Sequence, residues 1–188
     1  IEDSTVRGEI VLLEGSLQNI FAKHPYPIEI QGLLGELLTA SVLLASTIKI
    51  NGSLIIQARG GHPVDLLMVE CDTSRNVRAL ARWSGKTEGL GFSELLNGSN
   101  LVITLDPKQG ERYQGIVPLQ GNSLAESIEF YFQQSEQLAT RLWLTQGGGR
   151  AAGLILQQLP FNSEVQLSKE QNEEDWHRLT LLADTLTK

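Results

Sequence analysis

The chain has 188 residues and an ordinary globular composition, with 41% hydrophobic, 20% charged and 6% aromatic residues. Its formal net charge of −7 argues against a nucleic-acid-binding protein, because phosphate contacts need clustered positive charge. The single cysteine, Cys71, excludes an internal disulfide framework and a metal site built from several thiolates of this chain.

A strand and two helices are predicted for the N-terminal region. Residues 6–13 form the expected strand, and Gly15-Ser16 ends it and begins a short helix. Residues 28–46 then read as a long helix that is apolar nearly all round, which leaves two interpretations, a membrane span or a buried core helix. The polar side chains favour the core helix, so we expect no membrane contact; they are Gln31, Glu36, Thr39 and Ser41.

Residues 48–89 have the pattern of an antiparallel meander. Asn51-Gly52 predicts a hairpin between strands at 48–50 and 54–57, and two more strands are predicted at 64–70 and 77–83.

Two features of this meander concern exposure. Arg78 and Arg82 fall on the solvent face of the last strand, where we expect them to pair with carboxylates. Cys71 follows an apolar strand, which favours a buried and unreactive thiol.

Residues 100–144 contain the clearest turn and helix-capping signals in the chain. Strands are predicted at 101–105 and 112–119, and Pro118 restricts the second strand to a sheet edge or a strand end. Ser123 and Glu126 have the spacing of a capping box before a helix at 124–134.

The rest of the chain is expected to add two strands to the core, followed by a linker and a helix. Strands at 141–146 and 152–159 are joined by the glycines at 147–149, which fit a hairpin loop better than a phosphate-binding loop. Residues 162–175 are polar and read as a linker. From Trp176 to Leu186 an amphipathic helix follows, which should dock on the core or on a second subunit.

These elements predict an α+β fold in which antiparallel β-sheets pack with helices, with a C-terminal linker helix. We divide the chain into a core domain at residues 1–160 and a polar linker with its amphipathic helix at 161–188.

No catalytic constellation is visible in the sequence. His24, His62 and His177 lie far apart without metal-ligand spacing, and no serine has a GxSxG context. We therefore expect no enzymatic activity and no cofactor in this chain. The alternative is a small-ligand protein or enzyme that uses a cleft between the sheets, with Glu111, Arg112 and Tyr113 as polar lining.

Aromatic side chains are the candidates for binding another polypeptide. The helix at 124–134 has apolar groups on more than one face, a surplus that indicates a dimer contact or a surface for extended chains. The predicted substrate-binding residues are the aromatic ones of this region and of the tail: Tyr113, Phe130, Tyr131, Phe132, Trp143 and Trp176.

Several segments resemble one bacterial chaperone family. They are STVRGEI (4–10), GLLGELLTASVLLAST (32–47), GERYQGIVPLQG (110–121), YFQQSEQLATRLWL (131–144) and AAGLILQQLP (151–160). In this order they are similar to the redox-regulated holdase, the thirty-three-kilodalton heat-shock chaperone or 33 kDa chaperonin family. The resemblance covers most of the chain up to about residue 160.

The resemblance implies an ATP-independent holdase that binds unfolding proteins and prevents their aggregation during oxidative and heat stress. It also implies a homodimer in the cytoplasm, and no basic and then apolar leader opens the sequence to indicate export.

The family switches through a C-terminal module in which four cysteines hold zinc when reduced. Cys71 matches none of those ligands. Either the module was removed or disordered, or the chain lacks it by nature, and we favour removal. No residue of this chain can then be assigned to redox regulation, and we expect the chain to act as the binding core without its switch.

Overall fold

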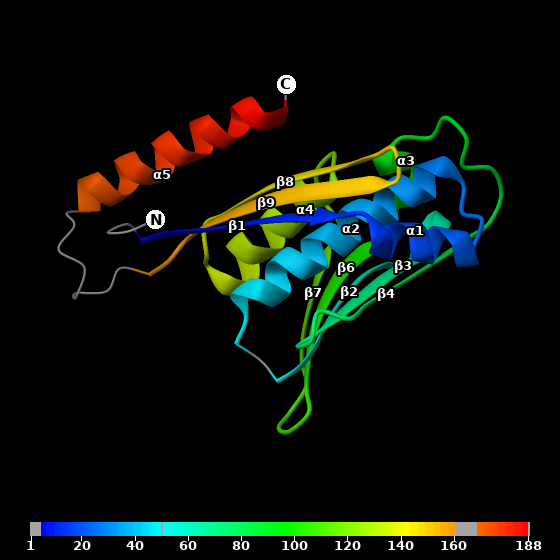
Figure 1. Ribbon diagram of the computed structural model, residues 1–188, viewed down its shortest axis with the longest axis horizontal. Coiled ribbons are helices and arrows are strands. Elements are labelled where there is room, and N and C mark those ends of the chain that lie inside the picture. The colour runs from blue at the N-terminus through cyan, green and yellow to red at the C-terminus, as the bar shows by residue number, and fades with distance from the viewer. Residues whose placement is uncertain (1–4, 50, 161–168, 188) are drawn as a thin grey trace.

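The structure is a computed structural model that describes residues 5–49, 51–160 and 169–187. Its strands form two antiparallel sheets, which confirms the α+β prediction (Figure 1). The small sheet has the order β1–β9–β8 and consists of β1 (Val6–Leu13), β8 (Thr140–Gly147) and β9 (Arg150–Gln158). The large sheet has the order β4–β3–β2–β6–β7, and the short β5 pairs with β3. Its members are β2 (Gly52–Arg59), β3 (His62–Asp72), β4 (Val77–Trp83), β5 (Leu96–Asn97), β6 (Asn100–Pro107) and β7 (Tyr113–Pro118).

The long helix α2 (Ile28–Thr47) lies between the two sheets and packs on both (Figure 1). It is long and apolar enough to cross a membrane, but 67% of the apolar stretch is buried within the fold. Leu34, Leu37 and Leu38 have no exposed surface. Each such leucine contributes about 1.5–3 kcal/mol of hydrophobic stabilisation. The interpretation of this stretch as a core helix is confirmed.

The remaining helices lie beside α2 between the sheets, at the ends of the sandwich and on one outer face (Figure 1). They are α1 (Gly15–Lys23), α3 (Phe92–Leu95), α4 (Leu124–Tyr131), α5 (Lys169–Asp184) and the short 3₁₀ helix η2 (Thr185–Thr187). A π-helical turn, η1 (Phe132–Glu136), continues α4 and ends at Gln137, which has the left-handed φ of 52°.

The predicted capping box of α4 is half present. Ser123 Oγ accepts a hydrogen bond from the backbone N–H of Glu126 at 3.1 Å, as predicted. The Glu126 carboxylate, however, accepts from the backbone N–H of Asn122 at 2.8 Å, one residue before the cap. The cap still satisfies two backbone donors at this end of α4.

The predicted hairpin at Asn51-Gly52 is wrong. The helix α2 runs to Thr47, Ile48 is its extended C-terminal cap, and β2 lies in the middle of the large sheet between β3 and β6. Gly52 pairs with Pro107 of β6, and a Cβ atom on Gly52 would overlap the carbonyl oxygen of Asp106. Close approach of two strands, and not a tight turn, therefore requires this glycine.

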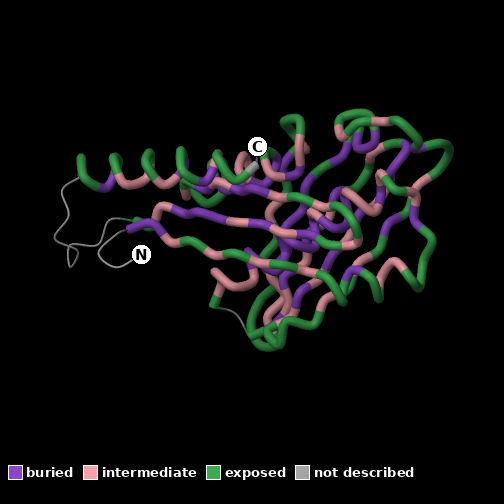
Figure 2. Tube along the Cα trace, turned by 45° about the horizontal axis from the view of Figure 1, so that its top comes forward, coloured by how far each residue is buried: buried purple, intermediate pink, exposed green. Residues whose placement is uncertain are grey.

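The tail helix docks on the core, which was one of the two predicted outcomes. α5 lies against the outer face of the small sheet, with Ala183 packed among Val6, Trp143 and Leu156 (Figure 1). Its other side stays exposed (Figure 2). The helix begins at Lys169, earlier than predicted, and part of the predicted linker lies at 161–168, outside the described residues.

Candidate functional site

The six predicted aromatic residues lie in three separate places. Phe130 and Trp176 line a groove beside α5, and Tyr113, Tyr131 and Phe132 line a cavity between the sheets. Trp143 lies beneath α5. The neighbours Phe130 and Tyr131 of α4 therefore face different hollows, the groove and the cavity.

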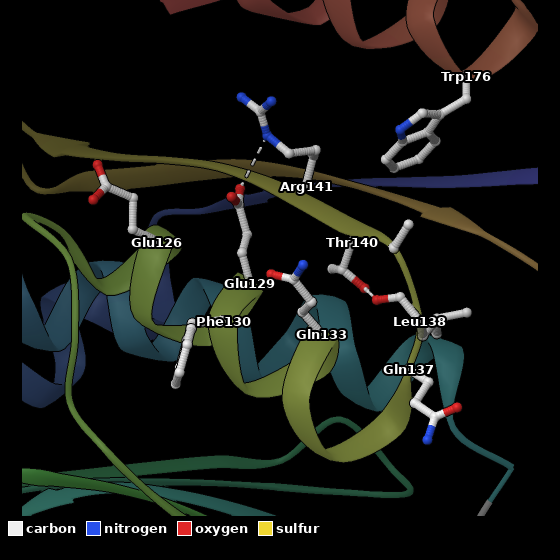
Figure 3. Close-up of a pocket in the computed structure, with 10 residues that line it drawn as sticks. Glu126, Glu129, Phe130, Gln133, Gln137, Leu138, Thr140, Arg141 and Trp176 are labelled. Atoms are coloured by element: carbon white, nitrogen blue, oxygen red, sulfur yellow. Dashed lines mark hydrogen bonds and ion pairs between the residues drawn. The ribbon is translucent and has the colours of Figure 1, made fainter. Parts of the chain in front are cut away.

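The groove beside α5 runs along α4, η1 and β8 and has a volume of about 550 Å³ (Figure 3). Figure 3 shows Phe130 projecting from α4 and Trp176 from α5. An ion pair lies between them, in which Arg141 Nε is 3.4 Å from Glu129 Oε1. Burial raises the pKa of Glu129, although its carboxylate also accepts the backbone N–H of Leu142 at 2.7 Å. The groove thus has a mixed polar and apolar lining, with one aromatic residue from each of two helices.

Trp143 holds α5 in place. Its indole Nε1 donates a hydrogen bond to Asp184 Oδ1 at 2.9 Å, and the Arg141 guanidinium lies 5.3 Å from the ring centroid. Only 9% of Trp143 is exposed. Its observed partners therefore belong to this chain, and a role in binding another polypeptide stays a prediction.

The cavity between the sheets receives the other three aromatic residues. The hydroxyls of Tyr113 and Tyr131 donate to Glu136 Oε1 at 3.3 and 3.4 Å. The ring of Tyr131 meets that of Phe132 edge-on, with centroids 5.5 Å apart. Burial raises the pKa of Tyr131 well above its usual range, and the hydrogen-bonding Tyr113 and the negative charge of Glu136 raise it further. Tyr131 is 1% exposed and Phe132 7%, whereas Tyr113 is 47% exposed.

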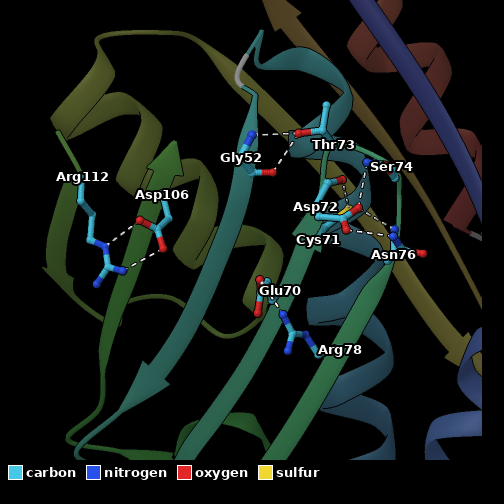
Figure 4. Close-up of polar contacts among 10 residues, drawn as sticks. All are labelled: Gly52, Glu70, Cys71, Asp72, Thr73, Ser74, Asn76, Arg78, Asp106 and Arg112. Carbon is cyan, nitrogen blue, oxygen red and sulfur yellow. Dashed lines mark hydrogen bonds and ion pairs between the residues drawn. The ribbon is translucent and has the colours of Figure 1, made fainter. Parts of the chain in front are cut away.

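The polar residues expected to line a cleft are arranged differently. Arg112 does not reach the cavity, because its guanidinium forms a two-pronged ion pair with Asp106 at 3.0 and 2.7 Å (Figure 4). That pair lowers the pKa of Asp106. Glu111 does not line the cavity either, and of the three predicted residues only Tyr113 does.

The outer face of the large sheet carries an apolar row that the sequence analysis did not identify as a site. The row crosses the sheet through paired positions of all five long strands, in the order Leu80, Met68, Gln57, Val102 and Ile116. Ile116 is 53% exposed and Leu80 41% exposed, each on an edge strand of the sheet. Within the row, Val102 is fully buried and Gln57 is polar, so the exposed apolar surface lies at the two ends of the row. In the part of the chain that the structure describes, no helix covers this face (Figure 1). Leu80 could have been found from the sequence, because it lies two residues from both Arg78 and Arg82 and so shares their solvent-facing side of the strand.

Ion pairs flank this apolar row. Arg78 pairs with Glu70 at 3.1 Å (Figure 4). Arg82 pairs with Asp65 at 2.7 Å, so the expected pairing of both arginines with carboxylates is confirmed. Both arginine side chains are largely exposed, so these pairs add little stability. They instead border the apolar row with charge.

Cys71 is buried on the inner face of β3, as predicted. Burial raises the pKa of its thiol, and its Sγ lies 3.7 Å from the carbonyl oxygen of Asp72 (Figure 4). Among residues 5–49, 51–160 and 169–187, no three His, Cys, Asp or Glu side chains are grouped to hold a metal ion. The residues described here therefore do not fit the zinc that the resemblance implies for the cysteine module.

Comparison with known proteins identifies the family. The sequence profile described as "Hsp33 protein" matches residues 1–188. The chain is 50% identical over 188 residues to the 33 kDa chaperonin of Pseudomonas paraeruginosa, covering 99% of this chain and 63% of that protein. It is 48% identical to the 33 kDa chaperonin of Azotobacter vinelandii, with the same coverage. The chain thus spans less than two thirds of the length of these relatives.

A solved structure supports the same fold. The crystal structure of the 33 kDa chaperonin of Thermotoga maritima superposes with a TM-score of 0.74 at 19% identity, covering 85% of this chain and 59% of that one. The profile match extends over all 188 residues, and the chain belongs to the Hsp33 protein family.

Proposed function

We propose that this chain is the polypeptide-binding core of an ATP-independent holdase, which binds unfolding proteins in the cytoplasm under oxidative and heat stress. Membership of the Hsp33 family, whose relatives are called 33 kDa chaperonins, supports a chaperone function. The observation that carries the proposal is the uncovered apolar row on the large sheet. The row offers exposed apolar side chains at its two ends, Leu80 and Ile116, and ion pairs beside it. Such a surface suits extended segments of varied sequence, because the hydrophobic effect is non-directional and scales with buried area.

The predicted aromatic residues enter this proposal to different extents. Tyr113 is exposed, and Phe130 and Trp176 are half-buried in their groove, so a client segment can reach these three in the folded chain. Tyr131, Phe132 and Trp143 would become available to a client only after local opening. We therefore place primary binding on the apolar row and a secondary contribution at the groove.

Binding, and not catalysis, is the activity that we propose for this chain. The family's redox control, through zinc and a four-cysteine module, has no counterpart among the residues described here. We propose that the core suppresses aggregation in reductant and in oxidant alike.

Light scattering of a heat-denatured test enzyme, without nucleotide, tests the proposal. The unmodified chain should reduce scattering with and without reductant. Ile116→Lys should weaken suppression, because it places a charge in the apolar row. Ile28→Lys is the matched control, since Ile28 is 67% exposed at the start of α2 and lies outside the row. Equal suppression by both variants would remove the row from the proposal, and no suppression by the unmodified chain would refute it.

We also propose self-association through the exposed side of α5. Leu181 and Leu182 of α5 and Leu186 of the following η2 are 53–68% exposed. Ile10 of β1 is 78% exposed on the face of the small sheet that α5 partly covers. A homodimer would bury these side chains. Sedimentation velocity over a range of concentrations should show a dimer that Leu182→Glu shifts toward monomer, and a concentration-independent monomer would contradict this.

A further inference from the structure

The cavity between the sheets has the size and the lining of a small-molecule site. Its volume is about 530 Å³, within the usual range of roughly 300–1,000 Å³ for ligand sites. Its walls come from both sheets, from the end of α2 and from η1. Most of the lining is apolar, and its main members are Ile48, Ile103, Leu105, Phe132, Leu138 and Leu159.

One cationic group in this wall is incompletely satisfied. Arg7 of β1 donates from Nη1 to the carbonyl oxygen of Thr47 at 3.1 Å and from Nη2 to Gln157 Oε1 at 2.6 Å. Its Nε is buried and has no hydrogen-bond partner. No carboxylate within the described ranges lies at ion-pair distance from Arg7. A half-buried guanidinium with only neutral acceptors favours an added anion, because desolvated charges are stabilised by pairing.

The cavity also has one carboxylate, that of Glu136, which already accepts hydrogen bonds from other residues of the wall. Glu136 lies on the π-helical turn η1 and accepts both tyrosine hydroxyls, one of which comes from β7 of the large sheet. It is exposed, so water also solvates it. Arg7, on the small sheet, is therefore the charged group of the lining that keeps a buried donor without a partner. A π-helical turn at this wall agrees with the frequent use of such turns at functional sites.

We propose that this cavity binds a small amphipathic monocarboxylate. Its carboxylate would pair with Arg7, between Thr47 and Gln157, and its aliphatic tail would lie along Ile103 and Leu105. This site is independent of polypeptide binding on the outer face of the large sheet. The ligand of the cleft between the sheets would thus be a carboxylate, and its cationic lining residue would be Arg7 instead of the Arg112 that the sequence suggested.

Methyl-resolved NMR on the whole chain tests the site, with octanoate as the probe and 1-octanol as its uncharged counterpart. Octanoate should shift the methyl signals of Ile48, Ile103 and Leu105 and leave those of Leu80 and Ile116 unchanged. It should bind at least about tenfold more tightly than 1-octanol, as expected for a charge-assisted pair. This arm needs no substitution.

Variants at Arg7 supply the second arm. Arg7→Gln should weaken octanoate binding about tenfold and leave 1-octanol within about twofold, whereas Arg7→Lys should keep most of the octanoate affinity. No binding, equal affinity for both probes, or shifts at Leu80 and Ile116 in place of the cavity residues would each overturn the proposal. Equal loss of both probes in Arg7→Gln would also overturn the assignment of the carboxylate to Arg7.

Discussion

Replacing Glu36 by glutamine should stabilise the fold at neutral and alkaline pH but not at acidic pH. Glu36 lies in the middle of α2 and faces a hollow lined by apolar side chains that include Leu33, Leu90 and Phe92. The described residues offer it no hydrogen bond or ion pair, and burial raises its pKa from 4.5 to about 7. The substitution keeps the shape of the side chain and removes the charge.

The size of the effect follows from that pKa. The difference between 4.5 and about 7 corresponds to roughly 3 kcal/mol, since each step of one in pKa is worth about 1.4 kcal/mol. Because the folded-state pKa lies above the unfolded one, protonated Glu36 supports the fold fully below about pH 4.5, and this support is lost as the pH rises through 7. Partial exposure reduces the expected gain of Glu36→Gln at pH 8 to about 2 kcal/mol.

Urea unfolding at several pH values between 4.5 and 8 measures this difference. The free energy of unfolding of Glu36→Gln minus that of the unmodified chain should rise from near zero at pH 4.5 to about 2 kcal/mol at pH 8. Glu174→Gln is the control, because Glu174 is an exposed helical glutamate of α5, and its difference should stay flat. A flat profile for Glu36→Gln would refute the burial argument.

Three further experiments, two on substituted chains and one on the unmodified chain, probe other parts of the fold. Gly52→Ala should lower the free energy of unfolding by about 3 kcal/mol, because the added Cβ would overlap the Asp106 carbonyl across β2 and β6. The control Gly98→Ala tests only the effect of positive φ, since no atom lies near that glycine, and similar thermal midpoints for both variants would contradict the packing argument. Ala183→Asp should detach α5, because it places a carboxylate among Val6, Trp143 and Leu156. Amide hydrogen exchange should then become faster in α5 and the small sheet alone, and unchanged protection would mean that the docking of α5 does not depend on this contact. Cys71 should react with a thiol reagent at pH 8 much more slowly in the folded chain than in urea, because it is buried and burial raises its pKa, and equal rates would disprove its burial.

The sequence predicted most elements but not their partners. The alternation in residues 77–83 and the spacing in residues 124–131 identified β4 and α4 because these patterns depend on one buried face. The hairpin at Asn51-Gly52 failed for a different reason. A glycine required by close strand packing has the same local signature as a glycine required by a turn, and only the pairing of Gly52 with Pro107 separates the two.

Site prediction shows the same limit. Aromatic content marked Tyr131, Phe132 and Trp143 as candidates, yet the structure places all three below 10% exposure, because burial depends on which helix or sheet covers a residue. No local pattern marked Ile116 as part of a site, since its place at the end of the row depends on the register of five strands.

The sequence by itself determined the class of fold, the core helix α2 and the family, because these follow from local periodicity and from segments compared along the chain. Tertiary structure alone decided that α5 covers the small sheet and that the outer face of the large sheet stays open. It also brought Arg7 of β1 into one cavity with Tyr113 of β7. These arrangements join residues far apart in the chain, and long-range contacts of this kind leave no periodic trace in the sequence.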